Sequence, residues 1–184
     1  DKLCYFVDSV MQAGAKCIIV HARTAVLGGL SPKENREIPP LRHDLVWKLK
    51  SKFKDVEIVL NGGIQTIPDA MAHLPYLNGV MIGRAAISNP MILSNVDRDV
   101  FNMNCLSLSR IEIAEKMSKY IDVELSTGVN LGSITRHMFG LFQGRPAARH
   151  WRRYLSENSN LRNSGGRQVV SNALELMERS ANIQ

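Results

Sequence analysis

Cysteine is scarce in this sequence, and long apolar runs are missing. The three cysteines, Cys4, Cys17 and Cys105, lie far apart, are odd in number and form no CxxC pair. That pattern argues against a disulfide framework and against a zinc site, so we expect no metal. It favours a reducing compartment, and we expect the cytoplasm, with an organelle as the alternative. No segment approaches the roughly 20 consecutive apolar residues of a membrane span, so we expect a soluble protein.

Acidic residues are nearly absent between positions 130 and 170. This segment holds seven arginines, no lysine and one acid, Glu157, and therefore carries the whole formal net charge of +6. Arg149, Arg152 and Arg153 recur at i, i+3 and i+4, so they share one side of a predicted helix. A solvated basic face is the simpler reading. The lack of compensating acids favours a face that binds the phosphates of a polyanion.

An initiator Met and a signal peptide are also absent, so we expect a fragment of a longer protein. Over residues 1–93, helix patterns alternate with short apolar strands predicted at 17–20, 57–60 and 79–82, as in a parallel α/β sheet. The wholly apolar run from Cys17 to Val20 predicts a strand covered on both faces. Three strands cannot close a barrel, so we expect the C-terminal part of a (β/α)8 barrel whose other five strands lie upstream.

The rest of the chain is predicted to be all-α. Periodicity breaks over residues 94–107, which we interpret as a linker, and residues 108–184 then hold four helix patterns without a strand. Their apolar positions fall within 114–125, 131–142, 147–155 and 170–181, with Pro146 in the first turn of the third helix. Short connections between these helices predict a small antiparallel bundle, with Trp151 and Tyr154 in its core.

Two strands of the first part end in glycine where a helix begins. Val59 to Leu60 runs into Asn61, Gly62 and Gly63, and a second apolar run ends at Gly83 and Arg84. Backbone N–H groups at such ends can hold a phosphate, and barrels of this class form a phosphate site after strands 7 and 8. The alternative is that these glycines only make turns.

His21 stands at the carboxyl end of the first predicted strand, two residues before Arg23. A histidine there is either structural or a ligand group, and the carboxyl edge of barrel strands favours the ligand role. A polar loop follows over residues 24–40, and loops of this length inside a domain are usually functional or disordered. The cysteines are poor nucleophile candidates, because none lies near a convincing base.

The sequence contains five long motifs: HARTAV at 21–26, GGLSPKENREIPPL at 28–41, NGGI at 61–64, VMIGRAA at 80–86 and TRHMFGLFQGRPAARHWRRYLSE at 135–157. Together they resemble the A-type tRNA-dihydrouridine synthases. The resemblance covers essentially the whole chain. It implies an FMN-binding (β/α)8 barrel followed by a helical tRNA-binding domain, and reduction of a D-loop uridine at position 20 or 20a, with NADPH reloading the flavin. Hydride would pass from reduced flavin to C6 of the uracil, and a cysteine acid would protonate C5.

By motif match, the resemblance also assigns residues. His21 would contact FMN, and its phosphate would be held by Asn61, Gly62, Gly63, Gly83 and Arg84. Contacts to tRNA would come from Lys33, Arg36, Arg149, Arg152 and Arg153. The family's acid cysteine and an FMN-contacting lysine have no counterpart here, so we expect this fragment to be inactive by itself. Two rivals stay open: another FMN- or phosphate-binding barrel oxidoreductase acting on a small molecule, and a non-catalytic RNA-binding module.

Overall fold

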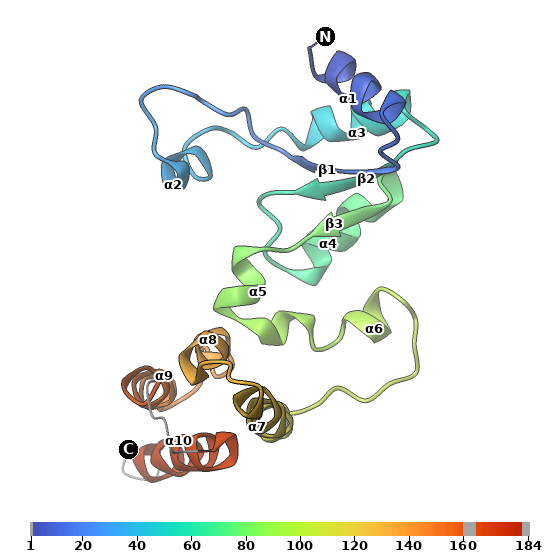
Figure 1. Ribbon diagram of the computed structural model, residues 1–184. Coiled ribbons are helices and arrows are strands. Elements are labelled where there is room, and N and C mark those ends of the chain that lie inside the picture. Colours follow the sequence, from blue (N-terminus) through green and yellow to red (C-terminus); the bar gives the residue numbers. More distant parts are fainter. Residues whose placement is uncertain (1, 160–164, 182–184) are drawn as a thin grey trace. The chain divides into compact units, whose positions relative to one another are not determined.

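The computed structural model describes residues 2–159 and 165–181, and the chain separates into two units, 1–85 and 86–184 (Figure 1). The boundary falls in α5 (Arg84–Ser88), eight residues before the end of the predicted barrel part at residue 93. The predicted linker contains the short helix α6 (Val96–Asp99). Each unit has a hydrophobic core of its own, and the two are described separately.

The first unit is built on a parallel sheet of three strands, β1 (Cys17–His21), β2 (Glu57–Asn61) and β3 (Gly79–Met81). Their spatial order is β1-β2-β3, so β2 is central. All three lie within one residue of the predicted positions. The carboxyl ends are aligned, because His21 pairs with Asn61 and Asn61 pairs with Met81.

Three helices pack on this sheet: α1 (Lys2–Gln12), α3 (His43–Lys52) and α4 (Ile67–His73) (Figure 1). A capping box opens α4: Thr66 accepts from the N–H of Asp69, whose carboxylate accepts from the N–H of Thr66. Ile58 and Leu60 of β2 are fully buried in the core. Burial of such side chains, at about 1.5–3 kcal/mol each, is the main force that holds helices on the sheet.

The prediction that β1 is covered on both faces is wrong. Its side chains alternate between exposed and half-buried, and Ile19 is 51% exposed. Because successive side chains of a strand point to opposite faces, Ile18 and Val20 reach the core, while Ile19 points to the other face, which the described residues leave open.

The segment between β1 and α3 is ordered by side chains that bind its own backbone. Its short helix α2 (Pro32–Asn35) begins with a capping box between Ser31 and Glu34. Asn35 bonds both backbone groups of Val26, at 2.7 and 2.9 Å. The guanidinium of Arg23 donates to the carbonyl of Pro39. Hydrogen bonds from side chains therefore hold the polar loop in a defined conformation. The loop also contains a helical turn that the sequence pattern did not predict.

In its described part, the second unit consists of helices and loops. After η2 (Pro90–Leu93) and α6 come α7 (Arg110–Ser126), α8 (Leu131–Thr135), η3 (Arg136–Met138), α9 (Ala148–Glu157) and α10 (Gly166–Ala181). Helix α10 packs against both α7 and α9. Trp151 is fully buried and donates to the carbonyl of Met138 at 2.8 Å, which confirms its predicted place in the core.

Two details of the predicted bundle are wrong. The second helix does not run from 131 to 142, because α8 ends at Thr135 and the chain continues through η3 into turns. A Cβ at Gly140 would lie 2.4 Å from the carbonyl oxygen of Ser88, so the turn there depends on a close backbone approach that periodicity cannot reveal. Pro146 precedes α9 and is not in its first turn: the N-cap is Ala147, in the left-handed conformation at φ 59°.

Candidate functional site

The first candidate site lies along the carboxyl ends of the three strands. The register places His21, Asn61 and Met81 side by side in one row, and paired residues of a parallel sheet point to the same face. His21 and Met81 are exposed and Asn61 is half-buried. The structure therefore brings together the two side chains that the sequence singled out at strand ends.

Gly62 and Gly63 continue directly from this row. Both have positive φ, 112° and 81°, which residues with a side chain rarely adopt. A Cβ on Gly62 would lie 2.9 Å from the ring of His21, and one on Gly63 would lie 2.4 Å from Cδ1 of Leu41. The ring and the loop can approach this closely only because both positions are glycine.

The polar groups of this glycine loop differ in how they are satisfied. The carbonyl oxygen of Gly62 lies 2.9 Å from Nε2 of His43. Within residues 2–159 and 165–181, the N–H groups of Gly62, Gly63 and Gly83 have no hydrogen-bond partner. Unpaired N–H groups at adjacent strand ends suit an anion such as a phosphate.

Gly83 and Arg84 follow β3, the neighbouring strand. A Cβ at Gly83 would meet no atom within 4 Å, so the space beside it is open. Arg84 is engaged: its guanidinium lies 3.0 Å from the carboxylate of Glu37 and 3.1 Å from the carbonyl of Arg36. Arg84 thus ties the carboxyl end of the sheet to the loop that carries α2. A phosphate at the glycine loop would compete with Glu37 for it.

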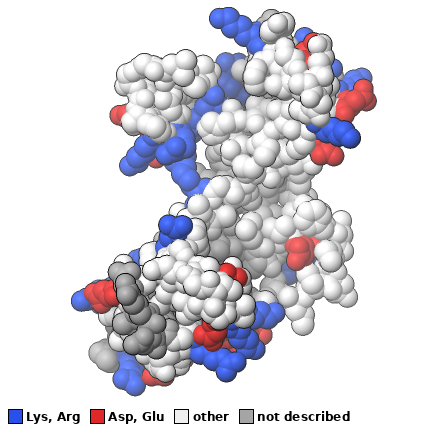
Figure 2. Space-filling view, in the orientation of Figure 1, with Lys and Arg blue, Asp and Glu red and all other residues white. Residues whose placement is uncertain are grey.

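Lys33 and Arg36 are exposed on this loop. Lys33 lies within α2 and Arg36 is its C-terminal cap, so the capping box at Ser31 and Glu34 sets their position. Its hydrogen bonds lower the pKa of the Glu34 carboxyl, which keeps this capping acid ionised. Figure 2 shows Lys and Arg side chains gathered on one side of the loop that contains α2.

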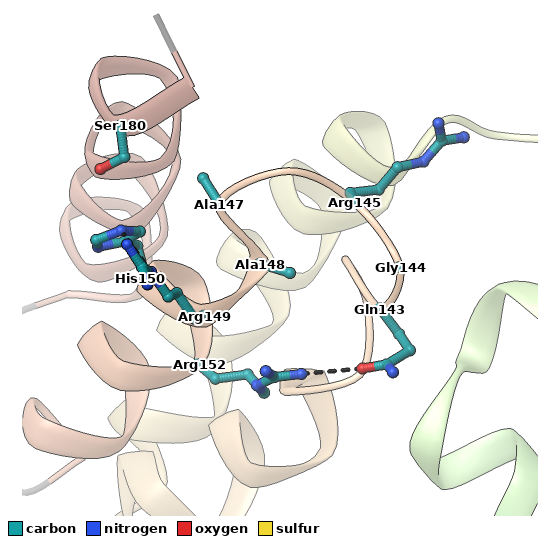
Figure 3. A pocket seen from close by; sticks show the side chains of 9 residues that line it. All are labelled: Gln143, Gly144, Arg145, Ala147, Ala148, Arg149, His150, Arg152 and Ser180. Atoms are coloured by element: carbon teal, nitrogen blue, oxygen red, sulfur yellow. Dashed lines mark hydrogen bonds between the residues drawn. The ribbon is translucent and has the colours of Figure 1, made fainter. Parts of the chain in front are cut away.

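The second candidate site is a basic hollow of about 350 Å³ on the second unit. It surrounds the turn that leads into α9, with Ser180 of α10 on its margin (Figure 3). Its polar and charged lining residues are Gln143, Arg145, Arg149, His150, Arg152 and Ser180, and none of the described residues that line it is an acid.

Two arginines of the hollow, Arg149 and Arg152, have hydrogen-bond partners that are not carboxylates. Arg152 donates to the side-chain oxygen of Gln143 at 2.9 Å, and Figure 3 shows the two side chains pointing at each other. Nε of Arg149 lies 3.2 Å from Nε2 of His150. Arg145 lies near Arg110, whose pKa is lowered by burial and by the charge of Arg145. The hollow therefore holds uncompensated positive charge, which favours an anionic ligand.

Arg153 differs from its neighbours on α9. It forms an ion pair with Glu157 at 2.7 Å and does not line the hollow. Of the other arginines in the basic segment, Arg162 lies outside the described residues. The sequence pattern did not assign Arg145, Gln143 or His150 to a site. The only signal for Arg145 was its membership of the acid-poor segment.

Other classes of site find no support in the part of the chain that the structure describes. No three His, Cys, Asp or Glu side chains there are grouped to hold a metal ion. No described helix is both long and apolar enough to cross a membrane. Cys17 and Cys105 are exposed, and Cys4 lies half-buried in α1.

Comparison with known proteins identifies the family to which the chain is similar. The profile of the family described as "Dihydrouridine synthase (Dus)" matches residues 1–179. The chain is 48% identical over 181 residues to a tRNA-dihydrouridine(20/20a) synthase of Yersinia pestis, covering 98% of this chain and 52% of that protein.

Two further relatives carry the same name. The protein of Escherichia coli (strain K12) is 48% identical over 178 residues, which cover 96% of this chain and 51% of the relative. The protein of Salmonella typhimurium is 51% identical over 158 residues, which cover 85% of this chain and 48% of the relative. The chain spans about half the length of these relatives, and it belongs to the dihydrouridine synthase family.

Proposed function

We propose that the protein containing this chain is a tRNA-dihydrouridine synthase that reduces a uridine of the D-loop, at position 20 or 20a. The observation that carries the proposal is the row of His21 and Asn61 beside the unpaired N–H groups of Gly62 and Gly63. It occurs in a chain whose relatives at about 48% identity are named for that activity. A phosphate-bearing cofactor next to an exposed imidazole suits this arrangement.

The parallel sheet supports the proposed architecture. Residues 1–93 would be the last part of a (β/α)8 barrel, 94–107 a linker, and 108–184 a helical tRNA-binding domain. The aligned carboxyl ends of β1, β2 and β3 support the barrel, because ligands of such folds lie at that edge. We place the protein in the cytoplasm.

FMN is the proposed cofactor, with NADPH as the reductant. Bound there, the flavin would supply the hydride that reduces the uracil ring. Gly62, Gly63 and Gly83 would donate their backbone N–H groups to its phosphate, and Arg84 would add charge. His21 and Asn61 would orient it from the sheet. The unpaired donors and the open space beside Gly83 support this fit.

The proposed RNA contacts occupy both units. Lys33 and Arg36 on the α2 loop, with Arg149, Arg152 and Arg153 on α9, would bind phosphates of the tRNA. A uridine must leave its stack to reach a buried reactive group, so a grip on the RNA body away from the reaction site is needed. The uncompensated charge of Arg149 and Arg152 supports this role more strongly than the ion-paired Arg153 does. We propose none of this chain's cysteines as the acid.

The test is complementation. Cells lacking the gene for the full-length protein should lose dihydrouridine at one D-loop site of their tRNA. A plasmid with the wild-type gene should restore it, and one with His21→Ala should not, although both proteins accumulate equally. His137→Ala, an exposed histidine of the second unit outside the hollow, serves as the matched control and should rescue fully. Unchanged dihydrouridine in the deletion strain, with no redundant enzyme present, would refute the proposed function.

A further inference from the structure

His43, the first residue of α3, contacts the glycine loop from nineteen residues away in sequence. Its Nε2 lies 2.9 Å from the carbonyl oxygen of Gly62. A carbonyl oxygen only accepts hydrogen bonds, so Nε2 carries the proton and donates it. The Gly62 carbonyl thus accepts a hydrogen bond from a side chain of another element.

The bond fixes the direction of one peptide group. In a trans peptide the C=O and the following N–H point in opposite directions within one plane. Because the oxygen of Gly62 points at His43, the N–H of Gly63 points away from α3. That N–H is one of the donors without a partner in the described residues.

The glycines make such an anchor necessary. With φ of 112° at Gly62 and 81° at Gly63, the loop lies in a region where glycine has unusual freedom. Without a side chain at either position, little opposes rotation of the peptide between them, and a rotated peptide would present a carbonyl where the N–H now stands. The bond from His43 selects one of the two orientations.

His43 is itself held in place. Its ring packs edge-on against the ring of His73 in α4, with the centroids 4.6 Å apart. The N–H of Arg42 donates to the carbonyl of Ala22 at 2.8 Å, which ties this segment to the end of β1. Leu41 fills the space beside Gly63. The donor therefore approaches the loop from a fixed framework.

We propose that His43 is a positioning residue for the flavin phosphate. It holds the Gly62–Gly63 peptide so that the N–H of Gly63 faces the phosphate, and it does not touch the cofactor. The inference rests on the proposed function, because it takes FMN as the ligand. Its chemical consequence is selective: His43 contributes to binding of a flavin that carries a phosphate and not to binding of one that lacks it.

The experiment compares FMN with riboflavin, which lacks the phosphate, by quenching of flavin fluorescence on the full-length protein. His43→Phe keeps a ring against His73 and removes the donor, whereas His43→Gln keeps an N–H donor. Wild type should bind FMN more tightly than riboflavin. His43→Phe should weaken FMN about tenfold, the value of one hydrogen bond, and leave riboflavin unchanged. His43→Gln should restore most of the FMN affinity, and His137→Phe should match wild type.

Retained riboflavin binding also reports that the His43→Phe protein is folded. An equal loss of both flavins in His43→Phe would overturn the inference, since it would mean a merely structural role. So would wild-type affinity for FMN in that variant. If wild type binds neither flavin, or does not distinguish them, the phosphate site of the proposed function is itself refuted, and the inference with it.

Discussion

Replacing Arg152 by Ala removes a charge that the structure leaves uncompensated, whereas replacing Arg153 removes one that is already paired. Arg152 has Gln143 as its partner, and Arg153 has the carboxylate of Glu157 at 2.7 Å. Both side chains are exposed on α9 and both substitutions change the net charge by the same amount. They therefore form a matched pair for testing which arginine contacts RNA.

The expected difference appears in the salt dependence of tRNA binding. Each phosphate contact contributes about 0.9 to the slope of log K against log salt for a duplex, and about 0.7 for a single strand. Each phosphate contact therefore adds a factor of about 3 to the loss of affinity between about 50 and about 200 mM salt. We expect Arg152→Ala to reduce the slope by about 1 and Arg153→Ala to leave it nearly unchanged.

The assay is filter binding or fluorescence anisotropy with unmodified tRNA and the full-length protein, over five or more salt concentrations. The slope is the informative quantity, because it counts phosphate contacts, whereas a single affinity also reflects the long-range field. Equal slopes for the two variants would refute the argument that the hollow around Gln143, Arg145, Arg149 and Arg152 is an RNA contact. A lower slope for Arg153→Ala alone would mean that Arg153, and not Arg152, contacts a phosphate.

Two further predictions concern stability. Trp151→Phe deletes the hydrogen bond to Met138 and should lower the free energy of unfolding by about 2–3 kcal/mol. Trp47→Phe should cost less, because the buried Nε1 of Trp47 has no hydrogen-bond partner among the described residues. Urea unfolding of both variants measures the difference, and equal losses would contradict the prediction. Burial, with a smaller effect from the charge of His43 and against the opposing effect of Asp69, lowers the pKa of His73. The folded state thus favours neutral His73, whose contribution to stability is fully present above about pH 6.5 and is lost as the pH falls through the folded-state pKa. Wild type should lose more stability than His73→Phe between about pH 8 and about pH 5, and parallel urea midpoints for the two proteins would count against this.

The elements that sequence reasoning predicted well are those whose signal is local. The strands predicted to begin at 17, 57 and 79 each depend on a run of neighbouring apolar residues, and the structure contains them. Burial of β1 could not be predicted in the same way. An apolar run does not show which faces of its strand other elements cover. In the described residues the core lies on the face of Ile18 and Val20, and Ile19 on the other face is 51% exposed.

In the candidate sites too, the sequence shows features that depend on neighbouring residues and misses those that depend on the fold. Spacing predicts that Arg149, Arg152 and Arg153 share one side of a helix, and all three lie in α9. Spacing cannot show that Glu157 pairs with Arg153 while Arg149 and Arg152 have His150 and Gln143 as partners. Likewise, the glycines at 62 and 63 are visible in the sequence, and the histidine that orients their peptide is not, because nineteen residues and a separate helix intervene. Sequence therefore identifies which backbone groups are available to a ligand. Which way those groups point, and which charges stay free to bind, depends on partners that only the fold brings together.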